Sequence, residues 1–205
     1  MKIKNLYLIY KKIYVNLLSP FALVILLMNE NPESIYLILL SIIIHEIGHF
    51  LGIKIFNVKI DNIKIEPFGV TISINKYTNY KKEILVASFG PLNGFFVATL
   101  CLFLQNKYPS VYIFYFMILN ISYSIINIIP CEFLDGGLIV KSILFLFLDT
   151  KKAYKITEMI YRISSVTIII LMILSCYYVN FNVSLTTISI FILIIFPHKN
   201  KSKYI

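Results

Sequence analysis

One short segment, His45-Glu46-Ile47-Gly48-His49, combines residues that bind metal ions with a residue that moves protons. Residues four apart lie on the same face of a helix, so both imidazoles can point at one metal ion. Glu46 lies beside them, where its carboxylate can take a proton from a water molecule. This H-E-x-x-H arrangement is typical of zinc hydrolases. The alternative is a Glu–His pair that only stabilises helix packing, but burying such charged groups in a membrane helix is costly.

A catalytic zinc ion usually has three protein ligands and one open position, so a third ligand is needed. The remaining histidine, His198, follows the last apolar segment and is expected to be solvated at the membrane interface. Asp135, in the run Phe133-Leu134-Asp135-Gly136-Gly137, is the favoured third ligand. Cys131 is the alternative as a thiolate ligand, and Glu132 is expected to carry only an interfacial charge.

Asn127 and Pro130 precede Asp135 and are the predicted substrate-binding residues. Pro130 ends the preceding helix and frees backbone groups there. The amide of Asn127 offers a donor and an acceptor, which suit a substrate backbone or an oxyanion. An interhelical hydrogen bond is the equally weighted alternative for Asn127.

The elements that position these residues follow from the composition. The chain has 205 residues, of which 59% are hydrophobic and 14% are charged. Ordinary soluble domains have about 25% charged residues, and disordered chains are poor in apolar side chains. The three cysteines lie scattered in apolar runs, which excludes a disulfide scaffold. A polytopic membrane protein remains.

Stretches of about 20 apolar residues predict transmembrane helices. We expect an all-α fold that forms a single membrane domain over residues 1–205. Between residues 54 and 82 the apolar residues alternate with polar ones, which predicts a short cytosolic β-hairpin over residues 58–74. Residues 138–148 are too few to span and predict an interfacial or re-entrant helix. The six expected helices cover residues 13–29, 34–53, 84–106, 108–131, 163–179 and 183–197.

With six spans, every one of the 19 basic residues except Lys107 falls on one side of the membrane. The positive-inside rule then places both termini in the cytosol. The net charge of +9 is explained by this topology and by anionic lipid head groups, so no nucleic-acid partner is expected. His49 and His45 lie roughly 6 and 12 Å from the cytosolic end of their span. Asp135 follows the cytosolic end of another span, so all three expected ligands lie toward the cytosol.

Taken together, these motifs resemble the site-2 proteases, which are intramembrane zinc metallopeptidases. Members carry H-E-x-x-H in one transmembrane helix and N-x-x-P…L-D-G near a later one. The corresponding residues here are the His45–His49 segment, Asn127 to Pro130, and Leu134-Asp135-Gly136-Gly137. Gly90-Pro91-Leu92-Asn93 is similar to the family's G-P-x-x-N element. The order of the motifs and the six spans resemble the group of the stage IV sporulation protein FB.

The resemblance implies a Zn²⁺-dependent endopeptidase with a membrane-tethered protein substrate, such as a pro-sigma factor in sporulation. It leaves room for inhibitory membrane partners. One alternative is a CAAX-type membrane zinc protease, whose third ligand is a later glutamate. The other alternative is a non-catalytic zinc-binding scaffold or transporter. Polar residues cluster at one face of two spans, which favours the protease. The later glutamates are Glu66, Glu83, Glu132 and Glu158.

Overall fold

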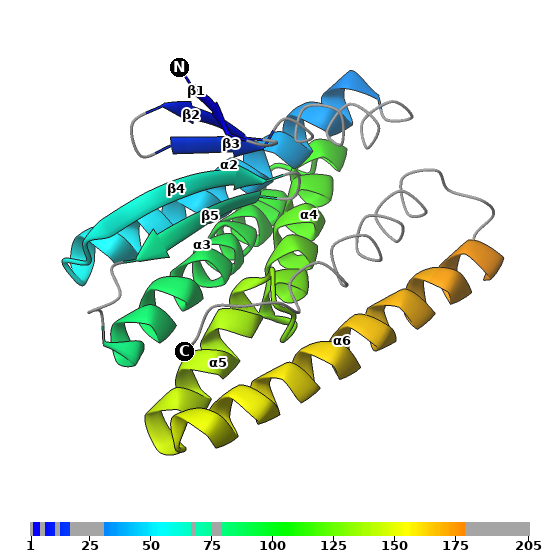
Figure 1. The fold of residues 1–205 in the computed structure, drawn as a ribbon. Coiled ribbons are helices and arrows are strands. Elements are labelled where there is room, and N and C mark those ends of the chain that lie inside the picture. The colour runs from blue at the N-terminus through cyan, green and yellow to red at the C-terminus, as the bar shows by residue number, and fades with distance from the viewer. Residues whose placement is uncertain are drawn as a thin grey trace.

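The computed structural model describes residues 2–4, 7–10, 13–16, 31–66, 69–74 and 79–178 (Figure 1). The described part is mainly helical and carries one sheet. Its elements are β1 (Lys2–Lys4), β2 (Tyr7–Tyr10), β3 (Ile13–Asn16), α2 (Pro32–Ile55), β4 (Ile60–Glu66), β5 (Gly69–Ile74), α3 (Tyr80–Lys107), α4 (Val111–Ile128), α5 (Asp135–Phe147) and α6 (Thr150–Tyr178).

Three of these helices, α2, α3 and α4, are long and apolar enough to cross a membrane. They correspond to the spans predicted at 34–53, 84–106 and 108–131. The third is shorter than predicted, since α4 starts at Val111 and ends at Ile128. Its end has a physical cause: Pro130 cannot donate a backbone hydrogen bond, and the residue before it, Ile129, is held in an extended conformation.

The long helix α6 contains most of the span predicted at 163–179, but it starts earlier, at Thr150. Its first turns form a helix because small and polar side chains there pack into the fold: Ala153 and Thr157 are both buried. The span predicted at 183–197 lies outside the described residues. The count of six spans therefore stays a prediction.

The first predicted span is wrong where it begins. Residues 13–16 form strand β3, which pairs antiparallel with β2 and parallel with β4. Aromatic and β-branched residues such as Ile13, Tyr14 and Val15 favour strands as readily as an apolar helix. The remainder of that predicted span, residues 17–29, lies outside the described residues.

The sheet has five strands in the order β1-β2-β3-β4-β5, so the described part is not all-α. In the segment where a hairpin was expected, β4 and β5 pair antiparallel, from Glu66 with Gly69 to Ile60 with Ile74. The other edge of β4 is taken by β3. Among the strands that the structure describes, β5 is therefore at one edge of the sheet.

The packing between the spanning helices is built from small and polar side chains. On α2 the buried residues include Ser41, His45 and Gly48. A Cβ atom on Gly48 would lie 2.8 Å from the Cβ of Asn93, so α2 and α3 approach closely because glycine leaves room. Large apolar side chains lie outside instead: Val111 is 81% exposed. This distribution suits helices whose outer faces meet lipid.

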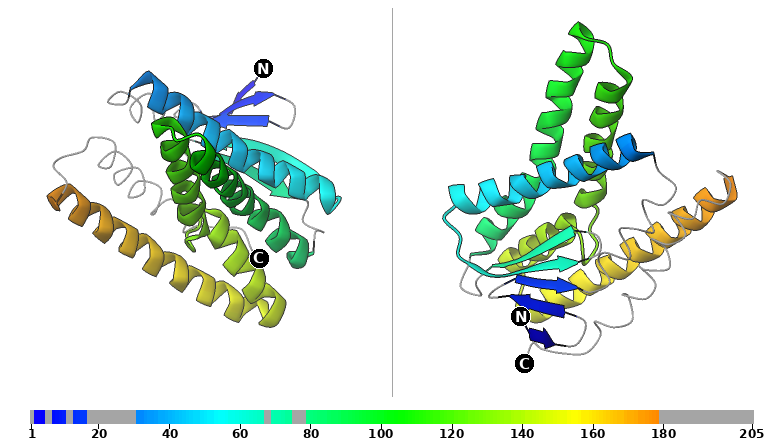
Figure 2. Two further views of the ribbon diagram at one scale, coloured as in Figure 1. Left: turned by 180° about the vertical axis from the view of Figure 1, so that it is seen from behind. Right: turned by 90° about the horizontal axis from the view of Figure 1, so that it is seen from above.

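The remaining helices hold the segment after α4 in place. Figure 1 shows α3, α4 and α5 between the sheet and α6, and Figure 2 shows the α3–α4 hairpin projecting away from the sheet. The Ser142 hydroxyl of α5 donates to Glu83 Oε2 at the start of α3, at 2.9 Å. The Tyr161 hydroxyl of α6 donates to the Gly137 carbonyl, at 2.8 Å. These two bonds fix α5, which begins at Asp135.

Candidate metal centre

Three side chains from two elements meet at one point. His45 Nε2 lies 2.9 Å from Asp135 Oδ2, and His49 Nε2 lies 3.1 Å from the same oxygen. The two Nε2 atoms are 3.1 Å apart. Within residues 31–66, 69–74 and 79–178, these are the His, Cys, Asp or Glu side chains grouped closely enough to hold one metal ion. The fold therefore joins the helical motif to an aspartate 86 positions after His49.

The ring of His49 is oriented by the backbone of α3. Its Nδ1 lies 3.0 Å from the carbonyl oxygen of Val86, which can only accept a hydrogen bond. Nδ1 must therefore carry the proton in the neutral ring, and Nε2 is left with its lone pair. A ligating histidine is commonly held in this way by its other nitrogen. The geometry at His49 thus fits a metal ion placed at Nε2.

Gly90 provides the space in which the imidazoles meet. A Cβ atom at this position would overlap His49 Nε2 and would lie 2.7 Å from His45 Nε2. Three residues later, Asn93 donates from Nδ2 to the carbonyl oxygen of Ile44 at 2.6 Å. The Gly-Pro-Leu-Asn element of α3 therefore allows α2 to pack closely against α3. It also binds the backbone of α2 at the residue before His45.

Two imidazole nitrogens and one carboxylate oxygen form the type of donor set that zinc takes in catalytic sites. The side chains of His45 and His49 are buried, and Asp135 is partly buried. Burial raises the pKa of the Asp135 carboxyl, but its contacts with the imidazoles of His45 and His49 outweigh this effect and leave the pKa below its ordinary value. The carboxylate is thus ionised, as a metal ligand must be.

Glu46 follows His45 in α2 and borders the same cluster. Its carboxylate is close enough to interact electrostatically with His49 and with the hydroxyl of Tyr123. Tyr123, on α4, also packs its ring edge-on against His45, with centroids 4.9 Å apart. A carboxylate beside the three donors, but not one of them, is a candidate general base.

The predicted substrate-binding residues lie at the end of α4 and just after it. Asn127 is buried, and its Nδ2 donates to the carbonyl oxygen of Tyr123, 3.0 Å away and one turn earlier in α4. That bond lies within one helix, so it differs from the interhelical bond considered from the sequence. Pro130 lies in the connection from α4 to α5. The paired glycines after Asp135 have a clear use here, because a Cβ on Gly136 would lie 2.7 Å from the Ile129 carbonyl oxygen.

The alternative third ligands have other contacts. Cys131 is fully buried with Sγ 3.6 Å from Ser165 Oγ, and burial raises the pKa of its thiol, which disfavours a thiolate. Glu83 accepts a hydrogen bond from Ser142. Glu158 lies 3.8 Å from Arg162. His198 falls outside the described residues.

Sequence reasoning missed two contributors to the site. Tyr123 contacts His45 but belongs to no motif; its spacing of four from Asn127, on the same face of α4, was the available signal. The carbonyl of Val86 has no signal in the sequence at all, because every residue carries a carbonyl. The Gly90 element was recognised, but its role as the space for both imidazoles was not predicted.

Comparisons with known proteins agree with this geometry. The sequence pattern of peptidase family M50 matches residues 33–111 and 104–171, which together exceed half of the chain. The chain is 29% identical over 137 residues to "Zinc metalloprotease MJ0392" of Methanocaldococcus jannaschii, covering 60% of this chain and 40% of that protein. It is 26% identical over 139 residues to "Stage IV sporulation protein FB" of Bacillus subtilis, covering 63% and 46%. The match thus spans less than half the length of either relative.

The fold is similar to a solved structure, the site-2 protease from Methanocaldococcus jannaschii. The TM-score is 0.69 at 21% identity, and the match covers 97% of this chain and 96% of that one. At this level of identity the likeness concerns the fold alone. The family itself rests on the sequence pattern, whose matched residues include every member of the cluster. The family predicted from the motifs is therefore confirmed, and the chain belongs to peptidase family M50.

Proposed function

We propose that this protein is an intramembrane zinc endopeptidase that cleaves a membrane-associated protein near the cytosolic face. One observation carries the proposal: Nε2 of His45 and of His49, inside α2, meet Oδ2 of Asp135, at the start of α5, within 3.1 Å. Glu46 borders the three donors. Membership of peptidase family M50 supports the reaction class.

His45, His49 and Asp135 are the proposed zinc ligands. Bound there, zinc supplies a Lewis acid that lowers the pKa of water and polarises a carbonyl oxygen. The residues of the chain provide the rest. Val86 and Asp135 hold the ring of His49 from its two sides. Glu46 takes the proton of the attacking water and delivers it to the departing amine.

The substrate must be extended before its peptide bond can be cut, because a helix uses its own carbonyl and amide groups. Strand β5 is the proposed docking edge, since β4 already pairs with β3 on its other side. An extended peptide can add to such an edge through backbone hydrogen bonds. Asn127 and Pro130 are the proposed contacts of the substrate beside the cluster.

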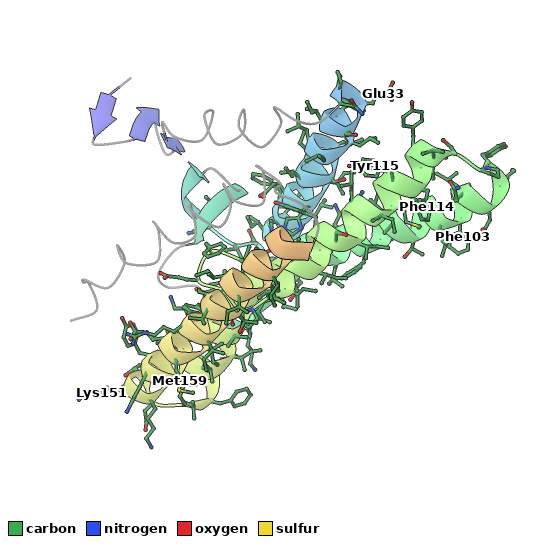
Figure 3. All side chains as sticks on the ribbon, turned by 90° about the vertical axis from the view of Figure 1, so that its right-hand side faces the viewer. Glu33, Phe103, Phe114, Tyr115, Lys151 and Met159 are labelled. Atoms are coloured by element: carbon green, nitrogen blue, oxygen red, sulfur yellow. The ribbon has the colours of Figure 1, made fainter. Side chains whose placement is uncertain are left out.

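Both termini are proposed to lie in the cytosol. The parallel pairing of β3 with β4 supports this, because it brings the N-terminal basic segment to the same side as residues 54–82. Figure 3 shows Phe103 and Phe114 at one end of the molecule and Lys151 at the other. The positive-inside rule places the end that carries Lys151 toward the cytosol.

The proposed substrate is a membrane-tethered protein, with a pro-sigma factor of sporulation as the specific form. Similarity to "Stage IV sporulation protein FB" supports this choice. A membrane partner that inhibits the enzyme is proposed on the same ground. The whole chain is proposed to be one membrane metalloprotease domain.

The test uses the full chain in liposomes with a tagged single-span substrate and measures zinc content and cleavage together. Glu46→Gln should retain about one zinc per chain while cleavage falls by roughly 10²–10⁴-fold, the usual contribution of a general base. Glu33→Gln is the matched control, because Glu33 lies in the first turn of the same helix and bonds Tyr112 instead. Substantial cleavage by Glu46→Gln would refute the assignment of the base.

A further inference from the structure

Three buried polar atoms beside the cluster have no hydrogen-bond partner among the described residues: His45 Nδ1, Asn120 Oδ1 and Ser124 Oγ. Their residues are 2%, 1% and 0% exposed. Buried polar atoms without partners are costly, and native proteins normally satisfy them with protein groups or with ordered water. Three such atoms on facing helices, one of them on a metal-ligand residue, call for a common explanation.

The orientation of the Asn120 amide identifies which of its atoms lacks a partner. Nδ2 lies 2.9 Å from the carbonyl oxygen of Phe116, which can only accept, so the nitrogen must face that oxygen. The second Nδ2 proton goes to Ser41 Oγ at 3.2 Å. Ser41 in turn donates to the carbonyl oxygen of Leu37. Both donors of Asn120 are thus in use, and Oδ1 is left as a strong acceptor.

The residues that carry the three atoms come from α2 and α4, and glycines of α3 lie against His45 and against Ser124. A Cβ on Gly90 would meet the two imidazoles, and a Cβ on Gly94 would overlap Ser124 Oγ. These glycines are one turn apart on the same face of α3, or about 6 Å. On the opposite side, Asn120 bonds Ser41, one turn before His45 in α2. One water molecule with hydrogen bonds of about 2.8 Å can join polar groups on neighbouring helices that lie about one helical turn apart.

We propose that His45, Asn120 and Ser124 form a binding site for one internal water molecule. The water accepts a hydrogen bond from His45 Nδ1–H, donates to Asn120 Oδ1 and makes its third bond with the Ser124 hydroxyl. Three bonds is the usual number for a buried water. The inference rests on the proposed function only where it assigns His45 as a ligand; the water site itself follows from the three atoms.

The consequence for the metal centre is that each histidine ring is oriented through its Nδ1 atom, the nitrogen that faces away from Asp135. Val86 holds His49 through a carbonyl oxygen. The water would hold His45 in the same way, by accepting a hydrogen bond from Nδ1–H. The lone pair of His45 Nε2 would then point toward Asp135. Asn120 and Ser124 are therefore positioning residues, which act on the metal through the water and the imidazole.

The first experiment detects the water without any activity. The full chain, labelled with ¹⁵N-histidine in lipid bilayers, contains three histidines, and His198→Gln reduces them to the two of interest. In water-edited solid-state spectra, the signal should pass from water to His45 Nδ1 in both metal-free and zinc-loaded protein. His49 Nδ1 should receive none, because its partner is a backbone carbonyl. A wild-type spectrum without transfer to His45 would overturn the proposal.

Variants then connect the water to the metal. Asn120→Leu preserves side-chain size and removes the acceptor; it should abolish the transfer and weaken zinc affinity by roughly 10–100-fold. Ser124→Ala is the milder variant if Asn120→Leu does not fold, and it should reduce both readouts. Ser88→Ala is the matched control, because Ser88 bonds the Ile84 carbonyl within α3. Unchanged water transfer and zinc affinity in both test variants would contradict the inference.

The two proposals fail in different ways. If the metal-free protein shows the water at His45 but never binds zinc or cleaves, the proposed function is wrong and the water site stands. If the protein binds zinc and cleaves while water never reaches His45 Nδ1, the proposed function stands and this inference is wrong.

Discussion

The two histidines of the cluster are one helical turn apart, yet their surroundings differ in kind. His49 is held from α3 by the backbone carbonyl of Val86. His45 faces α4, where the ring of Tyr123 packs edge-on against it and where Asn120 and Ser124 are its proposed partners through water. A backbone group persists through any substitution, whereas a side chain does not. We call His49 with its α3 contacts the α3 half of the site, and His45 with its α4 contacts the α4 half. Substitutions should affect the α3 half mainly by changing its shape, and the α4 half mainly by removing polar or aromatic groups.

The largest effect should come from Asp135, which contacts both halves through one oxygen. Asp135→Ala should remove zinc and reduce cleavage by more than the roughly 100-fold that loss of an outer partner costs. Asp149→Ala is the control, since that carboxylate is 82% exposed and pairs with Lys152. Zinc content and cleavage are measured on the same preparation. Retained zinc and activity would favour a glutamate ligand, as in the CAAX-type alternative.

The α3 half can be broken by adding a single carbon. In Gly90→Ala the new Cβ overlaps His49 Nε2, and α3 must move away from α2. We expect zinc affinity to fall by about 10–100-fold, because both imidazoles lose their alignment. Thr99→Ala, at an exposed position of the same helix, should leave affinity unchanged. The zinc affinity of both variants is measured by calorimetric titration. A wild-type affinity in Gly90→Ala would show that the imidazoles do not need this space.

The smallest effect sharpens the contrast between backbone and side-chain partners. Val86→Ala keeps the carbonyl that holds His49, so zinc affinity should stay within about twofold of the wild type. Stability should fall by roughly 1–2 kcal/mol, because Val86 packs in the core with Ile53 and Val58. Denaturant unfolding and zinc titration separate the two results. A loss of affinity like that expected for Asn120→Leu would remove the distinction drawn here.

The sequence predicted the parts of the site whose signal is local. His45, Glu46 and His49 follow from helical spacing, and Asp135 follows from its place after an apolar segment; the structure brings the three donors together. The contact of Val86 was out of reach, because it depends on how α3 packs against α2, and Tyr123 was signalled only by its spacing from Asn127. Such packing has no periodicity in the sequence.

The fold shows the same division between local and long-range information. The three inner helices correspond to the predicted spans because length and apolarity define them. The start of the first predicted span is wrong, because hydropathy does not distinguish an apolar helix from a strand that has found a partner. That partner, β4, lies on the far side of α2 in the sequence.

The pairing of β3 with β4 also fixes an order of events during synthesis. Ile13 pairs with Ile63, so these bonds cannot form until the ribosome has made both strands and the whole of α2 between them. The chain loses the conformational entropy of closing this long loop only at that stage. This entropy cost increases slowly with loop length. The nascent chain therefore contains the complete histidine helix before β3 can pair with β4. The pairing of β3 with β4 follows afterwards, and Asp135 joins the histidines only after α3 and α4 have been made.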